Sequence, residues 1–342
     1  MLKIAIRADG SKDIGMGHIV RCIALYKKFK QKKIEIIFIT NHNEDVERLL
    51  KYEKINFIGI TYETLYEELK IVNNIIKENR IDIFITDSYY IDEYYLKEIK
   101  PKPKLLVSID DNGICKYPSD IVINGNLYGT DIIYNKVHQN TKLLLGSKYT
   151  ILREEFANKE PIKIKKNINK VLVTMGGSDI NNFTKTVLES IYDLDCKVDI
   201  VIGNSYKYKE DLETVIRDNT KFNAIYNPKS MSQVMLNNDI AITSSGSTIY
   251  ELAVLGIPSI TTIQSKNQIN AAKKVENLNI MINLGEFSKI TKSELKKSTK
   301  ELMTNYEKRK QMSETALRIV SKNGTDNIIM EILKYYSNKY YI

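Results

Sequence analysis

Short β-branched segments alternate with longer amphipathic segments along this chain of 342 residues, and this alternation constrains the fold more than any other feature. Mostly apolar segments such as Ile81–Ile85 are typical of strands that are covered on both faces. Strands that alternate with helices form a parallel sheet with right-handed crossovers. In the first half we expect strands over Lys3–Asp9, Ile34–Thr40, Asn56–Ile60, Asp82–Asp87, Leu105–Asp110 and Ile121–Asn124, and helices over Gly17–Lys32, Asn43–Tyr52, Thr64–Asn79 and Asp92–Ile99.

The alternation stops at a polar segment and then begins again. Residues 160–167 contain a proline and lack a helical period, which is typical of a linker. The second half has expected strands at Lys170–Thr174, Val198–Ile202, Asn223–Tyr226, Ile240–Thr243 and Ile257–Ile263, with helices between them and over most of residues 291–322. We therefore expect an α/β protein of two doubly wound, Rossmann-like domains over residues 1–155 and 170–325, a linker over 156–169 and a C-terminal helix over 326–342.

Composition narrows the class of protein. The net charge is +9, but lysines are spread along the whole chain among glutamates and no nucleic-acid-binding module accompanies them, so we do not expect nucleic-acid binding. No apolar run reaches membrane-spanning length and the start of the chain lacks a signal-peptide pattern, so we expect a cytoplasmic protein without stable membrane insertion. The three cysteines and three histidines lack metal-ligand spacing, so we expect reduced cysteines, no metal and no cofactor.

The loops that follow the strands are the candidate binding sites, because ligands of open parallel sheets bind beyond the carboxyl ends of the strands. Neither half contains a GKS or GKT phosphate-binding loop, and the first glycine-rich turn lacks the third glycine of a dinucleotide fingerprint. If the two domains face each other across a cleft, the loops after Asp9, Asp87, Asp110, Met175 and Thr243 surround one ligand.

The turn Gly15–Arg21 follows the first expected strand and opens the first expected helix. Gly15 and Gly17 allow backbone N–H groups to approach an anion, and His18 adds a group that exchanges protons near neutral pH. We interpret His18 as the group that does the chemistry beside a bound nucleotide diphosphate. The alternative is that the glycines only shape a tight turn that His18 caps. Arg21 is interpreted as support for this turn on the helix face.

Two strand-to-helix turns of the second half, Gly176–Gly177 and Ser244–Ser247, have the glycines and hydroxyls suited to binding a diphosphate. In the helix after the second turn, Glu251 can accept hydrogen bonds from both ribose hydroxyls, and the amides of Asn267 and Gln268 suit sugar hydroxyls and N-acetyl groups. The alternatives are a simple helix cap with a solvated Glu251, and a polar loop around Asn267 and Gln268 that only starts a helix. The candidate residues of the two turns are Gly176, Gly177, Ser244, Ser245 and Gly246.

Four short motifs together resemble those of one enzyme family. They are Gly15–His18 with Arg21, Leu152–Phe156, Met175–Asp179 and Lys266–Gln268. In this combination the chain, from about residue 2 to 282, resembles the UDP-sugar hydrolases of pseudaminic acid biosynthesis, which act on UDP-2,4-diacetamido-2,4,6-trideoxy-β-L-altropyranose. The resemblance implies the GT-B fold, which is also the fold of the glycosyltransferase that makes lipid II. The segment from about Thr291 departs from the family by extending past its usual C-terminal region.

The resemblance also implies roles for individual residues. It implies that His18 is the catalytic base, that Gly15 and Gly17 face the diphosphate and that Glu251 binds the ribose. It further implies that Asn267 and Gln268 lie near the ligand. The segments Asp87–Tyr89 and Asp110–Asp111 resemble family loops that could hold the sugar or water, and Asp87, Tyr89 and Asp110 are the candidate residues. The alternative for the aspartates is a turn at a strand end.

The implied reaction is a metal-independent, inverting hydrolysis with His18 as the general base for water. It releases UDP and 2,4-diacetamido-2,4,6-trideoxy-L-altrose from a UDP-sugar substrate, and we expect a monomer or a homodimer. Three alternatives stay open: a GT-B glycosyltransferase with a UDP-sugar donor, a UDP-sugar 2-epimerase, and a nucleotide-sugar-binding protein without activity. The first half lacks a compact apolar loop suited to an acceptor surface, which favours hydrolysis.

Overall fold

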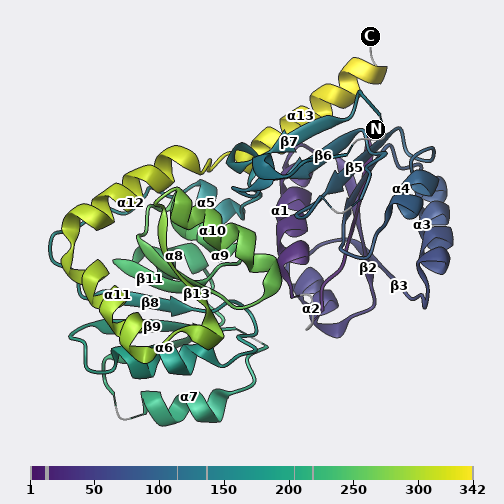
Figure 1. Ribbon diagram of the computed structural model, residues 1–342. Coiled ribbons are helices and arrows are strands. Elements are labelled where there is room, and N and C mark those ends of the chain that lie inside the picture. Colours follow the sequence, from purple (N-terminus) through teal and green to yellow (C-terminus); the bar gives the residue numbers. More distant parts are fainter. Residues whose placement is uncertain are drawn as a thin grey trace. The chain divides into compact units, whose positions relative to one another are not determined.

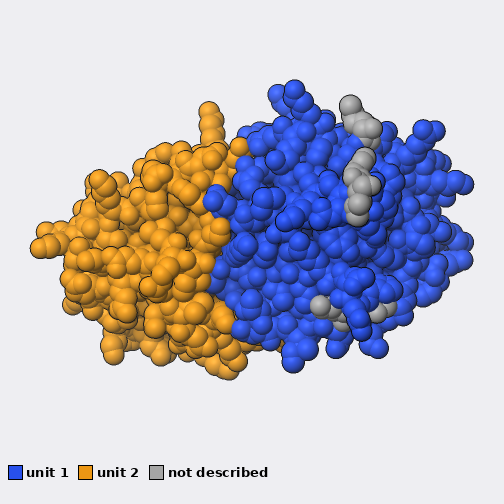
Figure 2. All heavy atoms as spheres, turned by 90° about the horizontal axis from the view of Figure 1, so that it is seen from above, with its two compact units in different colours: residues 1–153, 323–342 blue, residues 154–322 orange. Residues whose placement is uncertain are grey.

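The structure is a computed structural model that describes residues 2–11, 15–113, 115–135, 138–203, 205–217 and 219–340. The chain divides into two compact units, each with its own parallel sheet (Figure 1). Unit 1 comprises residues 1–153 and 323–342, and unit 2 comprises residues 154–322 (Figure 2). The segment 156–169 is therefore part of unit 2, and the chain returns to unit 1 for its last helix.

Unit 1 is built on a seven-stranded sheet with the order β3-β2-β1-β4-β5-β6-β7. The strands are β1 (Lys3–Ala8), β2 (Glu35–Asn41), β3 (Phe57–Ile60), β4 (Ile83–Asp87), β5 (Leu105–Ile109), β6 (Ile121–Asn124) and β7 (Lys142–Leu145). The helices are α1 (Gly17–Gln31), α2 (Glu44–Tyr52), α3 (Leu65–Asn79), α4 (Glu93–Ile99) and α13 (Gly324–Tyr340). The strand order reverses between β1 and β4, so the loops after these two strands are neighbours at the carboxyl edge of the sheet.

Alternating side chains of β1 explain why helices cover both faces of this sheet. Ile4 and Ile6 point to one face, where they share a core with buried residues of α1, α2 and α13. Ala5 points to the opposite face and packs with residues of α3 and α4. Both helix layers are visible beside the sheet in Figure 1. Because both faces are buried, the strands are apolar at nearly every position, as the sequence pattern predicts.

The helix α13 completes the core of unit 1. Its Ile328, Ile329 and Ile332 are fully buried in the core that contains α1. At its start, a Cβ on Gly324 would lie 2.1 Å from the carbonyl oxygen of Thr150, so only glycine fits this close backbone approach. The C-terminal helix thus supports the core of the N-terminal unit.

Unit 2 repeats the architecture with a six-stranded sheet of order β10-β9-β8-β11-β12-β13. Its strands are β8 (Lys170–Thr174), β9 (Lys197–Ile202), β10 (Phe222–Tyr226), β11 (Ile240–Ser244), β12 (Ser259–Ile263) and β13 (Met281–Glu286). Its helices are α5 (Glu154–Ala157), α6 (Phe183–Ile191), α7 (Lys209–Ile216), α8 (Met231–Leu236), α9 (Thr248–Val254), α10 (Ile269–Asn277), α11 (Lys292–Thr304) and α12 (Tyr306–Ile319). Short 3₁₀ helices complete the two units: η1 (Gly129–Asp131), η2 (Ser147–Tyr149), η3 (Lys266–Gln268) and η4 (Phe287–Lys289).

Both strand orders are of the doubly wound type, so the predicted class of two Rossmann-like α/β domains is confirmed. The sequence analysis missed β7 and β13, which are edge strands. The strand β7 consists of one lysine and three leucines, and β13 has only one β-branched residue, Ile282, so neither contains the β-branched run on which the prediction depended. The expected helical stretch 291–322 is divided at Asn305, whose side chain accepts a hydrogen bond from the Lys308 N–H and starts α12.

Candidate active site

The turn before α1 places His18 in the first turn of the helix. The residue at the cap position is Met16, whose side chain makes no capping hydrogen bond, so the turn is not capped by His18. Gly15 has φ +78°, a conformation that favours glycine, and a Cβ on Gly17 would meet no other segment of the described chain within 4 Å. The residues 12–14 that precede this turn lie outside the described residues.

The imidazole of His18 is buried and directed at the end of β4. Its Nδ1 lies 2.6 Å from Oδ1 of Asp87, the last residue of β4 and fully buried. An ionised carboxylate can only accept, so the hydrogen of the imidazole must be on Nδ1. The neutral ring then presents an unprotonated Nε2, which has no hydrogen-bond partner among the described residues. This is the tautomer that a general base requires.

Arg21, one turn further along α1, holds two carboxylates from two different strand ends. Its Nε and Nη2 each donate to Asp87 at 2.6 Å. Its Nη1 and Nη2 donate to Asp111 at 2.8 and 3.0 Å. Asp111 follows β5, so the guanidinium ties together β4, β5 and α1. The sequence analysis interpreted Arg21 as support for the turn before α1, and the structure shows its guanidinium paired with these two carboxylates.

Electrostatics keep both of these carboxylates ionised. Burial alone would raise the pKa of Asp87, but the charges and hydrogen bonds of Arg21 and His18 outweigh it and hold this pKa far below its ordinary value. Burial also opposes ionisation of Asp111, and Arg21 again reverses the effect, so its pKa is lowered. The same two carboxylates raise the pKa of Arg21 against its own desolvation. A charged Asp87 is the state that fixes the His18 tautomer.

Tyr89 and Asn126 complete the surroundings of His18 and Asp111. The Tyr89 ring stands edge-on to the imidazole, with ring centroids 4.3 Å apart, and its hydroxyl donates to Asp111 at 2.9 Å. The Asn126 amide donates to the other oxygen of Asp111 at 2.7 Å. Tyr89 was a sequence-based candidate, and the structure brings it together with His18 and Asp87. Asp111 entered the sequence analysis only as the neighbour of Asp110 in a matched loop, and Asn126 was not a candidate.

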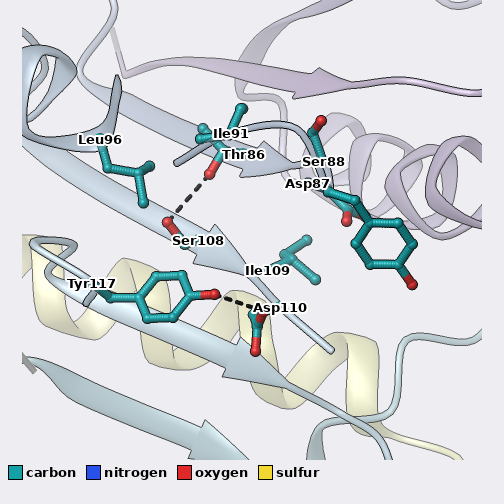
Figure 3. A pocket seen from close by; sticks show the side chains of 10 residues that line it. Thr86, Asp87, Ser88, Ile91, Leu96, Ser108, Ile109, Asp110 and Tyr117 are labelled. Carbon is teal, nitrogen blue, oxygen red and sulfur yellow. Dashed lines mark hydrogen bonds between the residues drawn. The ribbon is translucent and has the colours of Figure 1, made fainter. Parts of the chain in front are cut away.

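Asp110 has contacts of a different kind. Its oxygens accept hydrogen bonds from the hydroxyls of Tyr117 and Tyr134, both at 2.6 Å, and from the N–H groups of Asn112 and Gly113. These are the contacts expected of a turn at a strand end. Asp110 nevertheless lines a pocket at the ends of β4 and β5 that Asp87 and Tyr89 also line (Figure 3). Its side chain therefore shapes this pocket, and the neighbouring Asp111 is the one that reaches Arg21.

In unit 2, two candidate glycines lie near the hydroxyl of Ser244, and Gln268 lies near one of them. A Cβ on Gly176 would lie 3.9 Å from Oγ of Ser244, and a Cβ on Gly246 would lie 3.8 Å from the same oxygen. A Cβ on Gly246 would also lie 3.7 Å from Nε2 of Gln268. The ends of β8, β11 and β12 thus present two bare backbone segments, a hydroxyl and an amide to one place. Such a group of donors can bind phosphate oxygens and hydroxyls.

In other candidate residues of unit 2, the polar groups make hydrogen bonds within the fold. The Ser245 hydroxyl is buried against Thr261 and the carbonyl of Thr262. The carbonyl of Gly177 accepts from the Ser205 N–H at 3.2 Å and lies against Gly203. These residues position the two turns.

The N-terminus of α6, which follows the Gly176–Gly177 turn, is already occupied by a carboxylate of the chain. Asp179 accepts from the N–H groups of Phe183 and Thr184, both at 2.9 Å. A diphosphate would compete there with a buried carboxylate. The Ser244–Ser247 turn differs in that no side chain caps the helix α9 that follows it.

The remaining candidates differ in exposure. Glu251 in the first turn of α9 is buried, so the interpretation of Glu251 as a solvated residue does not hold. Asn267 is exposed and Gln268 is half-buried in η3.

From the Leu152–Phe156 motif, Phe156 is buried and Glu155 accepts from the Ser230 hydroxyl and the Ser232 N–H at the start of α8. That part of the motif is structural.

Two further properties bear on ligands. Within the described ranges, no cluster of three or more histidine, cysteine, aspartate or glutamate side chains could hold a metal ion. Across the same ranges, none of the helices combines the length and the apolar character needed to span a bilayer.

Comparisons with known proteins agree with this geometry. Residues 170–331 match the model of the glycosyltransferase family 28 C-terminal domain. The solved structure of MurG from Acinetobacter baumannii is similar, with a TM-score of 0.72 and 15% identity over 97% of this chain and 99% of that one. Together with the two doubly wound sheets, this likeness defines a protein of the GT-B fold.

Three relatives refine this class. The uncharacterized protein MJ1062 of Methanocaldococcus jannaschii is 30% identical over 98% of this chain and 73% of its own length. The spore coat polysaccharide biosynthesis protein SpsG of Bacillus subtilis is 27% identical over 94% of this chain and 95% of its own. The UDP-2,4-diacetamido-2,4,6-trideoxy-beta-L-altropyranose hydrolase of Campylobacter jejuni is 24% identical over 79% of this chain and 95% of its own length. The chain belongs to the same family as MJ1062.

The ion-pair network makes a prediction about stability. Arg21→Gln leaves Asp87 and Asp111 buried without a counter-charge, so we expect a loss of about 3 kcal/mol in the free energy of unfolding, as is usual for a broken buried ion pair. Urea unfolding followed by circular dichroism measures it. Arg48→Gln, which removes an exposed arginine of α2, is the matched control and should cost less than about 0.5 kcal/mol. Equal stabilities of the two variants would contradict the role given to Arg21.

Proposed function

We propose that this protein hydrolyses a UDP-linked deoxy-diacetamido sugar at its anomeric carbon, with His18 as the general base. The observation that carries the proposal is the hydrogen bond from His18 Nδ1 to the buried Asp87, which leaves Nε2 free to accept a proton. The hydrolase name of the Campylobacter jejuni relative and the glycosyltransferase family 28 match of residues 170–331 support the substrate class.

The proposed step transfers one proton and exchanges one bond. His18 Nε2 takes a proton from water as the water oxygen bonds to the anomeric carbon. The bond from that carbon to the diphosphate oxygen breaks, and UDP leaves with the electron pair. Attack opposite to the leaving group inverts the anomeric centre. Asp87 holds the ring in orientation and stabilises the imidazolium that forms, as the carboxylate partner of a catalytic histidine does.

Nucleotide recognition is assigned to unit 2 in this proposal. The backbone at Gly176 and Gly246, with the Ser244 hydroxyl and the Gln268 amide, supplies donors for the diphosphate and the neighbouring hydroxyls. Glu251, buried in the helix that follows, accepts hydrogen bonds from the ribose hydroxyls. Asn267, exposed in the same loop as Gln268, offers an amide to the ligand.

A second candidate is a GT-B glycosyltransferase that passes the sugar from UDP to an acceptor hydroxyl. The likeness to the MurG structure and the family 28 domain favour it. In that reaction His18 would take its proton from the acceptor instead of from water. Release of UDP in the absence of any acceptor separates the two functions.

The proposal predicts the effect of replacing His18. With a panel of UDP-linked deoxyamino sugars and detection by mass spectrometry, the wild type should release UDP from a diacetamido-trideoxy sugar without an acceptor. His18→Asn should lower this turnover by about 100-fold or more, the usual contribution of a general base, with UDP affinity nearly unchanged. His138→Asn changes an exposed histidine and is the control. Wild-type turnover in His18→Asn would rule out His18 as the base.

A separate prediction concerns the nucleotide. Glu251→Gln removes the charge that is proposed to accept both ribose hydroxyls, so UDP should bind about 10-fold or more weakly, as expected for the loss of hydrogen bonds to a charged group. Isothermal titration calorimetry with UDP measures the change. Glu314→Gln, on the exposed face of α12, should bind UDP like the wild type. If both variants bound UDP equally, Glu251 would not be the ribose ligand.

A further inference from the structure

The groups that face the His18 imidazole carry an unbalanced charge. Asp87 lies 2.6 Å from its Nδ1 and Arg21 Nη2 lies 3.0 Å from the same atom. These two opposite charges cancel. Arg21 Nη2 also lies 3.0 Å from Oδ2 of Asp111, which places that oxygen within about 6 Å of the ring. The three charged groups thus sum to one negative charge beside a neutral His18.

Other groups next to the ring add no charge to this sum. The Cys22 thiol donates to Asp87, and burial together with Asp87 raises its pKa, so it stays neutral. The Tyr89 hydroxyl donates to Asp111. Asp110 directs its two oxygens at Tyr117, Tyr134 and its own loop. The excess negative charge beside His18 therefore belongs to Asp111.

We propose that Asp111 is a positioning residue that supplies the counter-charge for the protonated form of His18. With Asp111 ionised, the protonation of Nε2 brings the four-group cluster to neutrality. Without it, Asp87 and Arg21 already balance, and the imidazolium would be an uncompensated cation in a buried place. The inference rests on the proposed function because it deepens the role of His18 as the base.

The structure holds this carboxylate in place through both of its oxygens. Arg21 donates to each of them, Tyr89 donates to Oδ2 and Asn126 donates to Oδ1. These donors come from α1, from the loop after β4 and from the loop after β6. A side chain fixed from three elements keeps its charge at a constant distance from the ring, which is what a preorganised electrostatic contribution requires.

The experiment is a proton NMR titration of the three histidines, with His18 assigned from the His18→Asn spectrum. It needs no substrate, so a failed hydrolysis assay and a failed inference are separate results. Removing a negative charge destabilises the imidazolium, so Asp111→Asn should lower the apparent pKa of His18 by about one unit or more. In the hydrolysis assay the acid limb of the pH–rate profile should move to lower pH by the same amount, with UDP affinity unchanged.

Control variants separate charge from structure. Asp111→Glu keeps the negative charge, so the pKa of His18 in this variant should stay close to that of the wild type. Asn126→Ala removes a hydrogen bond to Asp111 but no charge, and Asp45→Asn removes an exposed carboxylate of α2; each should leave His18 within about 0.3 units of the wild type. An unchanged His18 titration in Asp111→Asn overturns the inference.

A measurement on the wild type keeps the inference falsifiable if Asp111→Asn does not fold. The side-chain carboxyl carbon of Asp111, followed by carbon NMR, should change its shift with the same midpoint as His18. A carboxyl signal that does not respond to the titration of His18 overturns the inference without any substitution.

Discussion

The Asp87 carboxylate at the end of β4 is the group on which the candidate active site depends. It is fully buried, yet it is ionised, because Arg21 chelates it and His18 donates to it. A buried charge of this kind is tolerated only when every partner is present. The tautomer of His18, the place of Arg21 and the link to Asp111 all follow from the need to compensate this one carboxylate. The doubly wound fold makes this possible by bringing the ends of β1 and β4 together.

Much of the fold could be predicted because it follows from local patterns. Strand–helix alternation and apolar strands such as β4 required parallel sheets, and the turn at Gly15 and Gly17 marked the start of α1. The strands β7 and β13 were missed because their sequences lack the β-branched run by which the other strands were predicted.

The candidate site could be predicted only in part. His18, Asp87 and Tyr89 stand at a glycine turn or at a strand end, positions that topology marks as functional. Arg21 pairs with Asp87 and Asp111, which lie 66 and 90 positions away from it in the sequence, and no local pattern encodes these pairings. The adjacent aspartates show the limit: Asp110 stabilises its own loop, whereas Asp111 binds Arg21. Two neighbouring carboxylates after a strand give no local signal of which one turns toward α1.

The central claim is that water attacks the anomeric carbon of a UDP-sugar in this protein. It is tested most directly by reaction in ¹⁸O-enriched water without an acceptor, followed by mass spectrometry of both products. The account predicts that one ¹⁸O atom enters the released sugar and that UDP stays unlabelled. A label in UDP would place the cleavage at phosphorus. Release of UDP only after an acceptor is added would show transfer, and either result would contradict the claim.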